Sequence, residues 1–233
     1  MIELKNLYKS YRGKSVLMNI SLTIQDNEFF VLIGSSGCGK TTLLKTLNKL
    51  NPIDKGEILI NGTPINRIKV TQLPRLMGYV VQEGGLFPHR TIADNVATIP
   101  RLEGASKQAS RERALELLEL VGLETEMADR YPAQLSGGQR QRVGVARALA
   151  NRADILLMDE PFGALDPLVR ADLQRELKEI QRALGTTILF VTHDVDEAFT
   201  LGDQVAVLST GGRIEQVGTP TELLSSPASS FVA

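Results

Sequence analysis

The chain has 233 residues, of which 42% are hydrophobic, and a formal net charge of −1. This length suits one large or two small domains, and the near-neutral charge excludes bulk electrostatic binding to nucleic acid or anionic lipid. A single cysteine excludes an intrachain disulfide, and no apolar run approaches the roughly 18 residues that span a bilayer. Because Met1 opens no signal-peptide pattern, we expect a soluble protein that meets a membrane only through a partner.

The first part of the chain is predicted to form strands. One strand alternates apolar with other residues, at Val16, Met18, Ile20, Leu22 and Ile24. The apolar run at 29–33 predicts a buried strand. The turn dipeptide Asn61-Gly62 closes another strand at 56–60, and a further short strand is expected at 78–82.

A glycine-rich loop joins the strand at 29–33 to a helix predicted over 40–50, and it reads Gly34-Ser35-Ser36-Gly37-Cys38-Gly39-Lys40-Thr41. In such a loop, backbone N–H groups surround phosphate oxygens, and the helix N-terminus adds partial positive charge. We expect Lys40 to reach the β- and γ-phosphates and the Thr41 hydroxyl to ligate Mg²⁺, with Thr42 beside it in the nucleotide site. The alternative is a glycine-rich turn with a chance lysine. Cys38 is expected to be accessible without nucleotide.

From about Thr91 to Ala150 the pattern becomes helical. Thr91 with Asp94 predicts a helix cap, and Gly122 predicts a helix stop. The pentapeptide Leu135-Ser136-Gly137-Gly138-Gln139 then precedes a helix that runs to about 150. Ser136 and Gln139 fit a capping box, whereas the two glycines leave N–H groups free to face an anion. The two interpretations are compatible.

Two acids follow the apolar strand predicted at 155–158. Carboxylates at the C-terminal end of a parallel strand meet the ligand crevice. Asp159 suits the Mg²⁺ shell, usually through water, and Glu160 suits a general base or an orienter of the attacking water. The alternative is two acids that solvate a strand end.

The remaining elements alternate between helix and strand. Asp166-Pro167 opens a long amphipathic helix that Gly185 closes, and a buried strand follows at 187–191. A short helix from Asp194, a strand at 205–208 and a terminal helix capped by Thr219 complete the chain. This alternation predicts an α/β fold with a mostly parallel sheet, antiparallel early strands and a helical insertion at 91–150.

The glycine-rich loop and the pentapeptide at 135–139, in this order, resemble the ATP-binding cassette (ABC) family, and the resemblance extends over essentially the whole chain. It implies one nucleotide-binding domain at 1–233. That domain would combine a P-loop NTPase (RecA-like) core and an antiparallel β subdomain, at about 1–90 and 151–233, with an α-helical subdomain at about 91–150.

The resemblance also implies roles for single residues. Asp159 matches the Walker B aspartate, Glu160 the catalytic glutamate, and His193 the switch histidine that contacts the γ-phosphate. Gln82 matches the Q-loop glutamine that reaches Mg²⁺ and the attacking water. Tyr11 matches the aromatic that stacks on adenine, and Asp166 the D-loop aspartate. From the residues alone, Gln82 could be a solvated strand end, Tyr11 a core aromatic and Asp166 a helix N-cap.

Family resemblance further implies a head-to-tail homodimer on ATP binding. Ser136 and Gly138 of one chain would close on the γ-phosphate bound by the other, with Gly137 and Gln139 in the same motif. The implied partners are integral membrane permease subunits and, indirectly, a solute-binding protein, with no nucleic acid. We therefore expect the chain at the cytoplasmic face of the cell membrane, held there by the permease.

Four stretches resemble bacterial importers of quaternary-amine osmoprotectants (glycine betaine, carnitine, choline), and they lie at 47–50, 81–92, 159–167 and 192–198. Sulfonate and nitrate importers share the pattern at 162–166, so an importer of another solute, such as these or an amino acid, is an alternative. A soluble ABC ATPase without a transport role is another, although those usually carry tandem cassettes or coiled-coil insertions. Many osmoprotectant cassettes continue into regulatory CBS domains, whereas this sequence ends at Ala233, so regulation through such domains is unsupported.

Overall fold

The structure is a computed structural model of the chain that describes residues 1–81, 85–163 and 165–233. The chain divides into two compact units. The first unit comprises Met1–Leu73 and Gly185–Ala233, and the second comprises Pro74–Leu184. The helical segment predicted at 91–150 lies entirely within the second unit.

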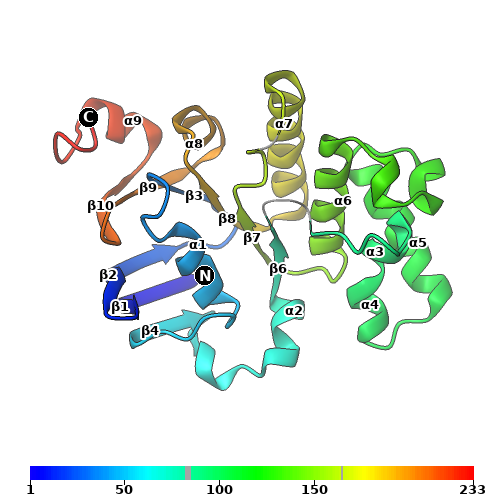
Figure 1. Cartoon of the computed structure of the whole chain (residues 1–233), viewed down its shortest axis with the longest axis horizontal. Coiled ribbons are helices and arrows are strands. Elements are labelled where there is room, and N and C mark those ends of the chain that lie inside the picture. Colours follow the sequence, from blue (N-terminus) through cyan, green and yellow to red (C-terminus); the bar gives the residue numbers. More distant parts are fainter. Residues whose placement is uncertain (82–84, 164) are drawn as a thin grey trace. The chain divides into compact units, whose positions relative to one another are not determined.

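An antiparallel sheet forms the N-terminal part of the first unit (Figure 1). Its strands, in the order β2-β1-β4-β5, are β2 (Lys14–Ile24), β1 (Ile2–Tyr11), β4 (Lys55–Ile60) and β5 (Thr63–Pro64). The turns at 12–13 and 61–62 hold all four residues at positive φ, which matches the right-handed twist of a two-residue hairpin. The predicted antiparallel arrangement of the early strands is confirmed.

The alternation predicted along β2 holds only for its second half. Ile20, Leu22 and Ile24 are buried, but towards the start of the strand Leu17 is buried and Met18 is only half-buried. Asn19 explains the change, because it is a bulge residue with a φ of 57°. Leu7 pairs with Ile20 and Tyr8 pairs with Met18, so the register of β1 and β2 skips Asn19. An extra residue of this kind shifts the phase of a strand by one position.

Four further strands of the first unit stand in the order β10-β9-β3-β8. They are β10 (Arg213–Gly218), β9 (Gln204–Ser209), β3 (Phe29–Ile33) and β8 (Thr187–Thr192). β3 runs parallel to β8 and β9, and every residue of β3 and β8 is buried, as the apolar runs predict. The helices of this unit are α1 (Lys40–Leu47), α8 (Val195–Leu201) and α9 (Pro220–Ser225). α1 ends three residues before the predicted position.

The second unit contains the parallel strands β6 (Met77–Val80) and β7 (Ile155–Asp159), together with most of the helices. The helices are α3 (Ile92–Val96), α4 (Thr98–Leu102), α5 (Lys107–Leu120), α6 (Gly137–Leu149) and α7 (Pro167–Leu184), and α2 (Leu73–Leu76) leads into β6. Gly122 at φ 67° and Gly185 at φ 62° follow the ends of α5 and α7, as predicted. Among the described residues, no helix has the length and apolar character that crossing a membrane requires.

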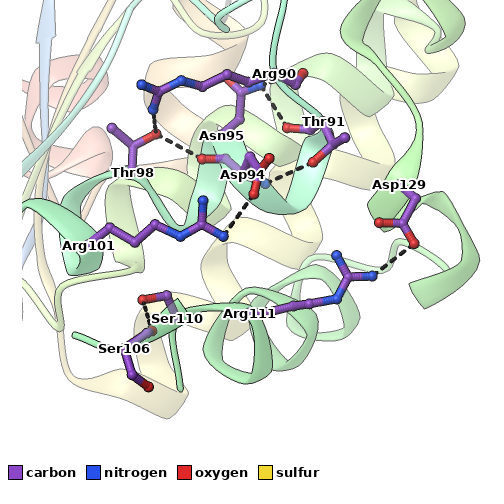
Figure 2. Close-up of polar contacts among 10 residues, drawn as sticks. All are labelled: Arg90, Thr91, Asp94, Asn95, Thr98, Arg101, Ser106, Ser110, Arg111 and Asp129. Atoms are coloured by element: carbon purple, nitrogen blue, oxygen red, sulfur yellow. Dashed lines mark hydrogen bonds and ion pairs between the residues drawn. The ribbon is translucent and has the colours of Figure 1, made fainter. Parts of the chain in front are cut away.

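Asn95 on α3 holds the segment at 87–91 by hydrogen bonds to its backbone. Its side chain is fully buried, and Oδ1 accepts the N–H of Phe87 at 2.7 Å. Nδ2 lies within 3.2 Å of the carbonyl oxygens of Phe87, Arg90 and Thr91. One amide group therefore contacts backbone groups of three residues in the segment that leads into α3. Figure 2 shows Asn95 beside Arg90 and Thr91.

Ion pairs join neighbouring parts of the same helical segment. Figure 2 shows Asp94 paired with Arg101 at 2.8 Å and Arg111 paired with Asp129 at 2.8 Å. The Arg111 guanidinium holds the pKa of Asp129 below its usual range. Thr91 accepts the N–H of Asp94 at 3.2 Å, which confirms the predicted cap at the start of α3.

We predict that Asn95→Ala lowers the free energy of unfolding by about 2–4 kcal/mol, because it removes several hydrogen bonds that a fully buried amide makes to the backbone of the segment at 87–91. Urea denaturation followed by circular dichroism measures this. Gln108→Ala, at an exposed position of α5, is the matched control and should change stability by less than about 0.5 kcal/mol. Equal stability of the two variants would refute the anchoring role of Asn95.

Candidate functional site

The glycine-rich loop connects β3 to α1, and its path requires glycine at two positions. Gly39 has a φ of 115°, and a Cβ there would lie 2.7 Å from the carbonyl oxygen of Val16. A Cβ on Gly34 would lie 2.3 Å from the carbonyl oxygen of Leu208. Both distances are well below van der Waals contact, so a side chain at either position would displace the loop from β2 or β9.

Lys40, the first residue of α1, places a buried cation under this loop. It is 4% exposed, and its Nζ donates to the carbonyl oxygens of Gly34 at 2.6 Å and Ser35 at 3.1 Å. A buried ammonium group needs polar partners, and these carbonyls provide them. The ammonium group and the first N–H groups of α1 are hydrogen-bond donors of the kind that bind phosphate groups at a helix N-terminus.

The rest of the loop divides into an exposed rim and a covered base. Ser35, Ser36 and Gly37 are exposed, whereas Thr41 and Thr42 are half-buried in the first turn of α1. The structure therefore places these residues in the predicted strand–loop–helix arrangement. Their roles as nucleotide and Mg²⁺ ligands stay predictions.

The expectation that the Cys38 thiol is accessible is wrong. Cys38 is 1% exposed. A Cβ on Gly34 would lie 2.8 Å from its Sγ, so the thiol lies close under the start of the loop. Because Ser35, Ser36 and Gly37 form the exposed rim, the side chain of Cys38 is directed into the core beneath it. A buried thiol of this kind is an inert structural group.

Strand register places His193 at the same edge of the first unit as the phosphate loop. β3 and β8 are parallel, and Ile33 pairs with Thr192. Gly34 and His193 are therefore the next residues of two adjacent strands, at their C-terminal ends, where ligands of α/β folds bind. His193 is exposed, as a group that contacts a ligand would need to be.

Buried side chains hold both neighbours of His193 in place. Thr192 Oγ1 accepts the N–H of Asp194 at 3.0 Å and donates to Oε2 of the buried Glu197 at 2.5 Å. Asp194 in turn caps α8 by accepting the N–H groups of Asp196 and Glu197. Sequence reasoning missed the role of Glu197, and the available signal was an acid directly before the buried Ala198 of α8.

In the second unit, strand register places Asp159 at the C-terminal edge of the parallel pair β6 and β7. Val80 pairs with Met158, so Asp159, the last residue of β7, lies at the end where ligands of α/β folds bind. Asp159 is 6% exposed, and the hydroxyl of Tyr79 donates to its Oδ2 at 3.3 Å. Burial, and then the charge of Asp159, raise the pKa of Tyr79 well above its usual range, so this hydroxyl stays a donor.

Glu160 follows β7 in a strained backbone conformation. Its φ is 44°, in the left-handed region that a glutamate rarely adopts, and its carbonyl accepts the N–H of Gly163 at 3.3 Å. Such a conformation costs about 1 kcal/mol or more, and this kind of strain is concentrated where the direction of a side chain matters. The half-buried Glu160 therefore has a fixed position rather than being one of two freely solvated acids.

The pentapeptide at 135–139 forms the predicted capping box. Ser136 Oγ accepts the N–H of Gln139 at 3.2 Å, and Gln139 Oε1 accepts the N–H of Ser136 at 2.9 Å. Ser136 and Gly137 are exposed, and Gly138 is buried. A Cβ on Gly138 would lie 2.8 Å from Cγ1 of Val169, so this glycine also permits α6 and α7 to approach each other closely. The anion-binding role of the motif stays a prediction.

Two other predicted residues have clear local positions. Asp166 is exposed and accepts the N–H of Val169 at 3.1 Å, so it is the N-cap of α7. Tyr11 is the last residue of β1 and is 42% exposed, so it is not a core aromatic. Gln82 lies outside the described residues.

After this part of the chain, the carbonyl oxygen of Gly85 accepts a hydrogen bond from Nη1 of Arg147 at 2.7 Å. Burial lowers the pKa of this arginine.

Comparison with known proteins gives one consistent family. Residues 17–163 match the family described as ABC transporter. The chain is 49% identical over 233 residues to the choline transport ATP-binding protein OpuBA of Bacillus subtilis (strain 168), covering all of this chain and 61% of that protein. It is 48% identical over 232 residues to the glycine betaine uptake system ATP-binding protein YehX of Escherichia coli (strain K12), covering all of this chain and 75% of that protein. The chain thus spans about three-fifths of the first relative's length.

A solved structure shares the same fold. The dimeric ATP-binding cassette MJ0796, in a post-hydrolysis state bound to ADP and phosphate, aligns with a TM-score of 0.85 at 34% identity. The alignment covers 94% of this chain and 99% of that one. The predicted fold class, a P-loop NTPase of the ABC type, is therefore confirmed.

We predict that Cys38 in the native protein reacts with a maleimide at least about 100-fold more slowly than in urea, because reaction requires local opening of the loop. A time course of labelling, followed by mass spectrometry, gives both rates. Ser36→Cys in a Cys38→Ser background is the matched control, since Ser36 belongs to the exposed rim and should label rapidly. Native and urea rates for Cys38 within about threefold of each other would contradict its burial.

Proposed function

This chain belongs to the ABC transporter family, and we propose that it is the ATP-binding and ATP-hydrolysing subunit of an importer. The observation that carries the proposal is the buried ammonium group of Lys40, held at the start of α1 by the carbonyl oxygens of Gly34 and Ser35. This arrangement offers a triphosphate both a fixed positive charge and a set of backbone N–H donors.

ATP is bound mainly through its phosphates in this proposal. The loop residues that would contact them are Gly34, Ser35, Ser36, Gly37, Cys38, Gly39, Lys40, Thr41 and Thr42. Cys38 contributes its backbone, since its thiol is buried. Tyr11, exposed at the end of β1, would stack on the adenine base.

The residues present also fit Mg²⁺, which prefers oxygen ligands. Thr41 offers a hydroxyl at the start of α1, and Asp159 offers a carboxylate whose second oxygen is restrained by Tyr79. Gln82 is the third proposed ligand. When bound, Mg²⁺ neutralises charge on the β- and γ-phosphate oxygens.

Hydrolysis requires attack of a water oxygen on the γ-phosphorus. At the same time, the bond between the γ-phosphorus and the oxygen that bridges it to the β-phosphate breaks. We assign Glu160 to orient this water and accept its proton, with Gln82 as a further orienting group. His193 would contact the γ-phosphate, and Lys40 would offset the charge that develops on it. The products are ADP and inorganic phosphate.

One chain provides only part of this site in the proposal. Ser136, Gly137, Gly138 and Gln139 would complete the γ-phosphate site of a second copy, with Asp166 nearby in the same interface. The exposure of Ser136 and Gly137 at the N-terminus of α6 supports this, and so does the similarity to a dimeric cassette. Closing and reopening of the dimer would drive the permease subunits that hold the chain at the cytoplasmic face of the membrane.

The proposed solute is a quaternary-amine osmoprotectant. Two relatives of 48–49% identity are named for transport of choline and uptake of glycine betaine, which supports this class. The chain would not contact the solute itself. Its specificity would come from the permease subunits and from a solute-binding protein. An importer of another solute is the alternative.

We predict that Glu160→Gln keeps ATP affinity within about twofold of wild type and lowers turnover by roughly 100-fold or more, because an amide cannot accept the proton. Phosphate release and calorimetric titration measure the two quantities. The exposed residue Glu179 on α7 gives the matched control Glu179→Gln, which should retain full turnover. Near wild-type hydrolysis by Glu160→Gln would remove Glu160 from the catalytic role.

The solute assignment predicts a defect in cells that lack the chain. Uptake of radiolabelled choline or glycine betaine should fall and should be restored by the wild-type chain but not by Glu160→Gln. Equal uptake of both compounds with and without the chain, measured while no second importer is expressed, would redirect the assignment to another solute.

A further inference from the structure

A buried lysine lies beneath the exposed ring of Tyr11. Lys9 is 7% exposed, and its Nζ lies 5.1 Å from the centroid of the Tyr11 ring, within the range of a cation–π contact. Tyr11 itself is 42% exposed at the end of β1. One side of the ring therefore meets a cation that is largely removed from solvent, while much of the ring remains open.

Asp54 fixes this cation to β1. Its Oδ1 accepts from Lys9 Nζ at 2.9 Å, its Oδ2 accepts the N–H of Ser10 at 2.7 Å, and its own N–H donates to the carbonyl oxygen of Tyr8 at 2.9 Å. These contacts join Asp54 to three consecutive residues of β1. Lys9 therefore has little freedom to leave the ring.

Strand stability alone does not account for this arrangement. The partner carboxylate of Lys9 is 41% exposed, and ion pairs that reach solvent contribute little to stability. The placement of the ammonium group on an exposed aromatic ring has a more specific consequence. A cation on one face of an aromatic ring withdraws electron density from it and restrains its orientation, and both changes favour stacking of an electron-rich purine on the open part of the ring.

We propose that Lys9 is a positioning residue for the nucleobase, which it serves by fixing and polarising Tyr11. This inference rests on the proposed function, in which Tyr11 stacks on adenine. It adds that base affinity depends on a lysine that does not itself contact the nucleotide, and that Asp54 supports that lysine.

The test compares a ligand that has a base with one that has none. MgATP and magnesium tripolyphosphate are titrated calorimetrically into wild type, Lys9→Met and Lys9→Arg. We expect Lys9→Met to weaken MgATP binding by about threefold to tenfold and to change tripolyphosphate binding by less than about twofold. Lys9→Arg keeps the cation and should retain most of the ATP affinity. Lys5→Met, which removes an exposed lysine from the same strand, is the matched control and should change neither.

Two further variants separate positioning from a general effect on folding. Tyr11→Ala should weaken MgATP binding, and adding Lys9→Met to it should cause no further loss, because the lysine acts through the ring. Asp54→Asn should give a smaller loss in the same direction as Lys9→Met. It keeps the inference testable if Lys9→Met does not fold, as circular dichroism would show.

Several results would overturn the inference. They are equal losses for MgATP and tripolyphosphate, additive losses in the double variant, or unchanged MgATP affinity in both Lys9→Met and Asp54→Asn. If wild type binds neither ligand, the proposed function fails and the inference falls with it. If wild type binds both and Tyr11→Ala weakens MgATP while Lys9→Met does not, only the role of Lys9 is lost.

Discussion

The ammonium group of Lys40 lies under a loop whose own carbonyl oxygens, from Gly34 and Ser35, are its hydrogen-bond partners. A cation can be buried this far only where polar groups compensate it, and these two carbonyl oxygens contribute to that compensation. The arrangement fixes the ammonium group at the loop where a phosphate would bind. It also restricts the sequence, because Gly34 and Gly39 approach backbone carbonyls too closely for any side chain.

Parallel strand pairing positions the candidate groups within each unit. The pairing of Ile33 with Thr192 places His193 at the edge of the first unit where the loop begins. In the second unit, the pairing of Val80 with Met158 places Asp159 and Glu160 at the C-terminal end of β7. Each group is further restrained by a buried neighbour or by its backbone. Glu197 acts on the turn around His193 through Thr192, Tyr79 contacts Asp159, and Glu160 has a left-handed φ.

Most of the fold and much of the candidate site could be predicted from the sequence, because they depend on local patterns. Continuous apolar runs specify β3, β7 and β8, and the polar residues at helix starts specify caps at Thr91, Ser136 and Thr219. The structure confirms these caps. Ser136 is therefore a helix N-cap, and this structural role is compatible with a role at a phosphate. Asp166 is likewise a helix cap, whatever else it contacts.

What the sequence could not predict depends on contacts between distant residues. The burial of Cys38 follows from the path of the loop, and the phase change in β2 follows from a bulge at Asn19. β10 was missed because its half-buried positions include the polar residue Gln216 while Val217 is exposed, so apolar residues do not mark one face of the strand. The contact of Lys9 with Asp54 joins residues 45 positions apart, so no local pattern indicates it.

The central claim is that the Lys40 loop of one chain and the Ser136 motif of another form a single ATP site. Mixing the Lys40→Ala and Ser136→Arg variants tests it most directly. In a mixed dimer, both substitutions fall in one composite site, and the second composite site has wild-type residues from both chains. We expect neither variant alone to dimerise with Mg²⁺ and ATP, and a 1:1 mixture to recover part of the wild-type dimer by sedimentation velocity. No recovery at any mixing ratio, with both variants folded, would contradict the composite site.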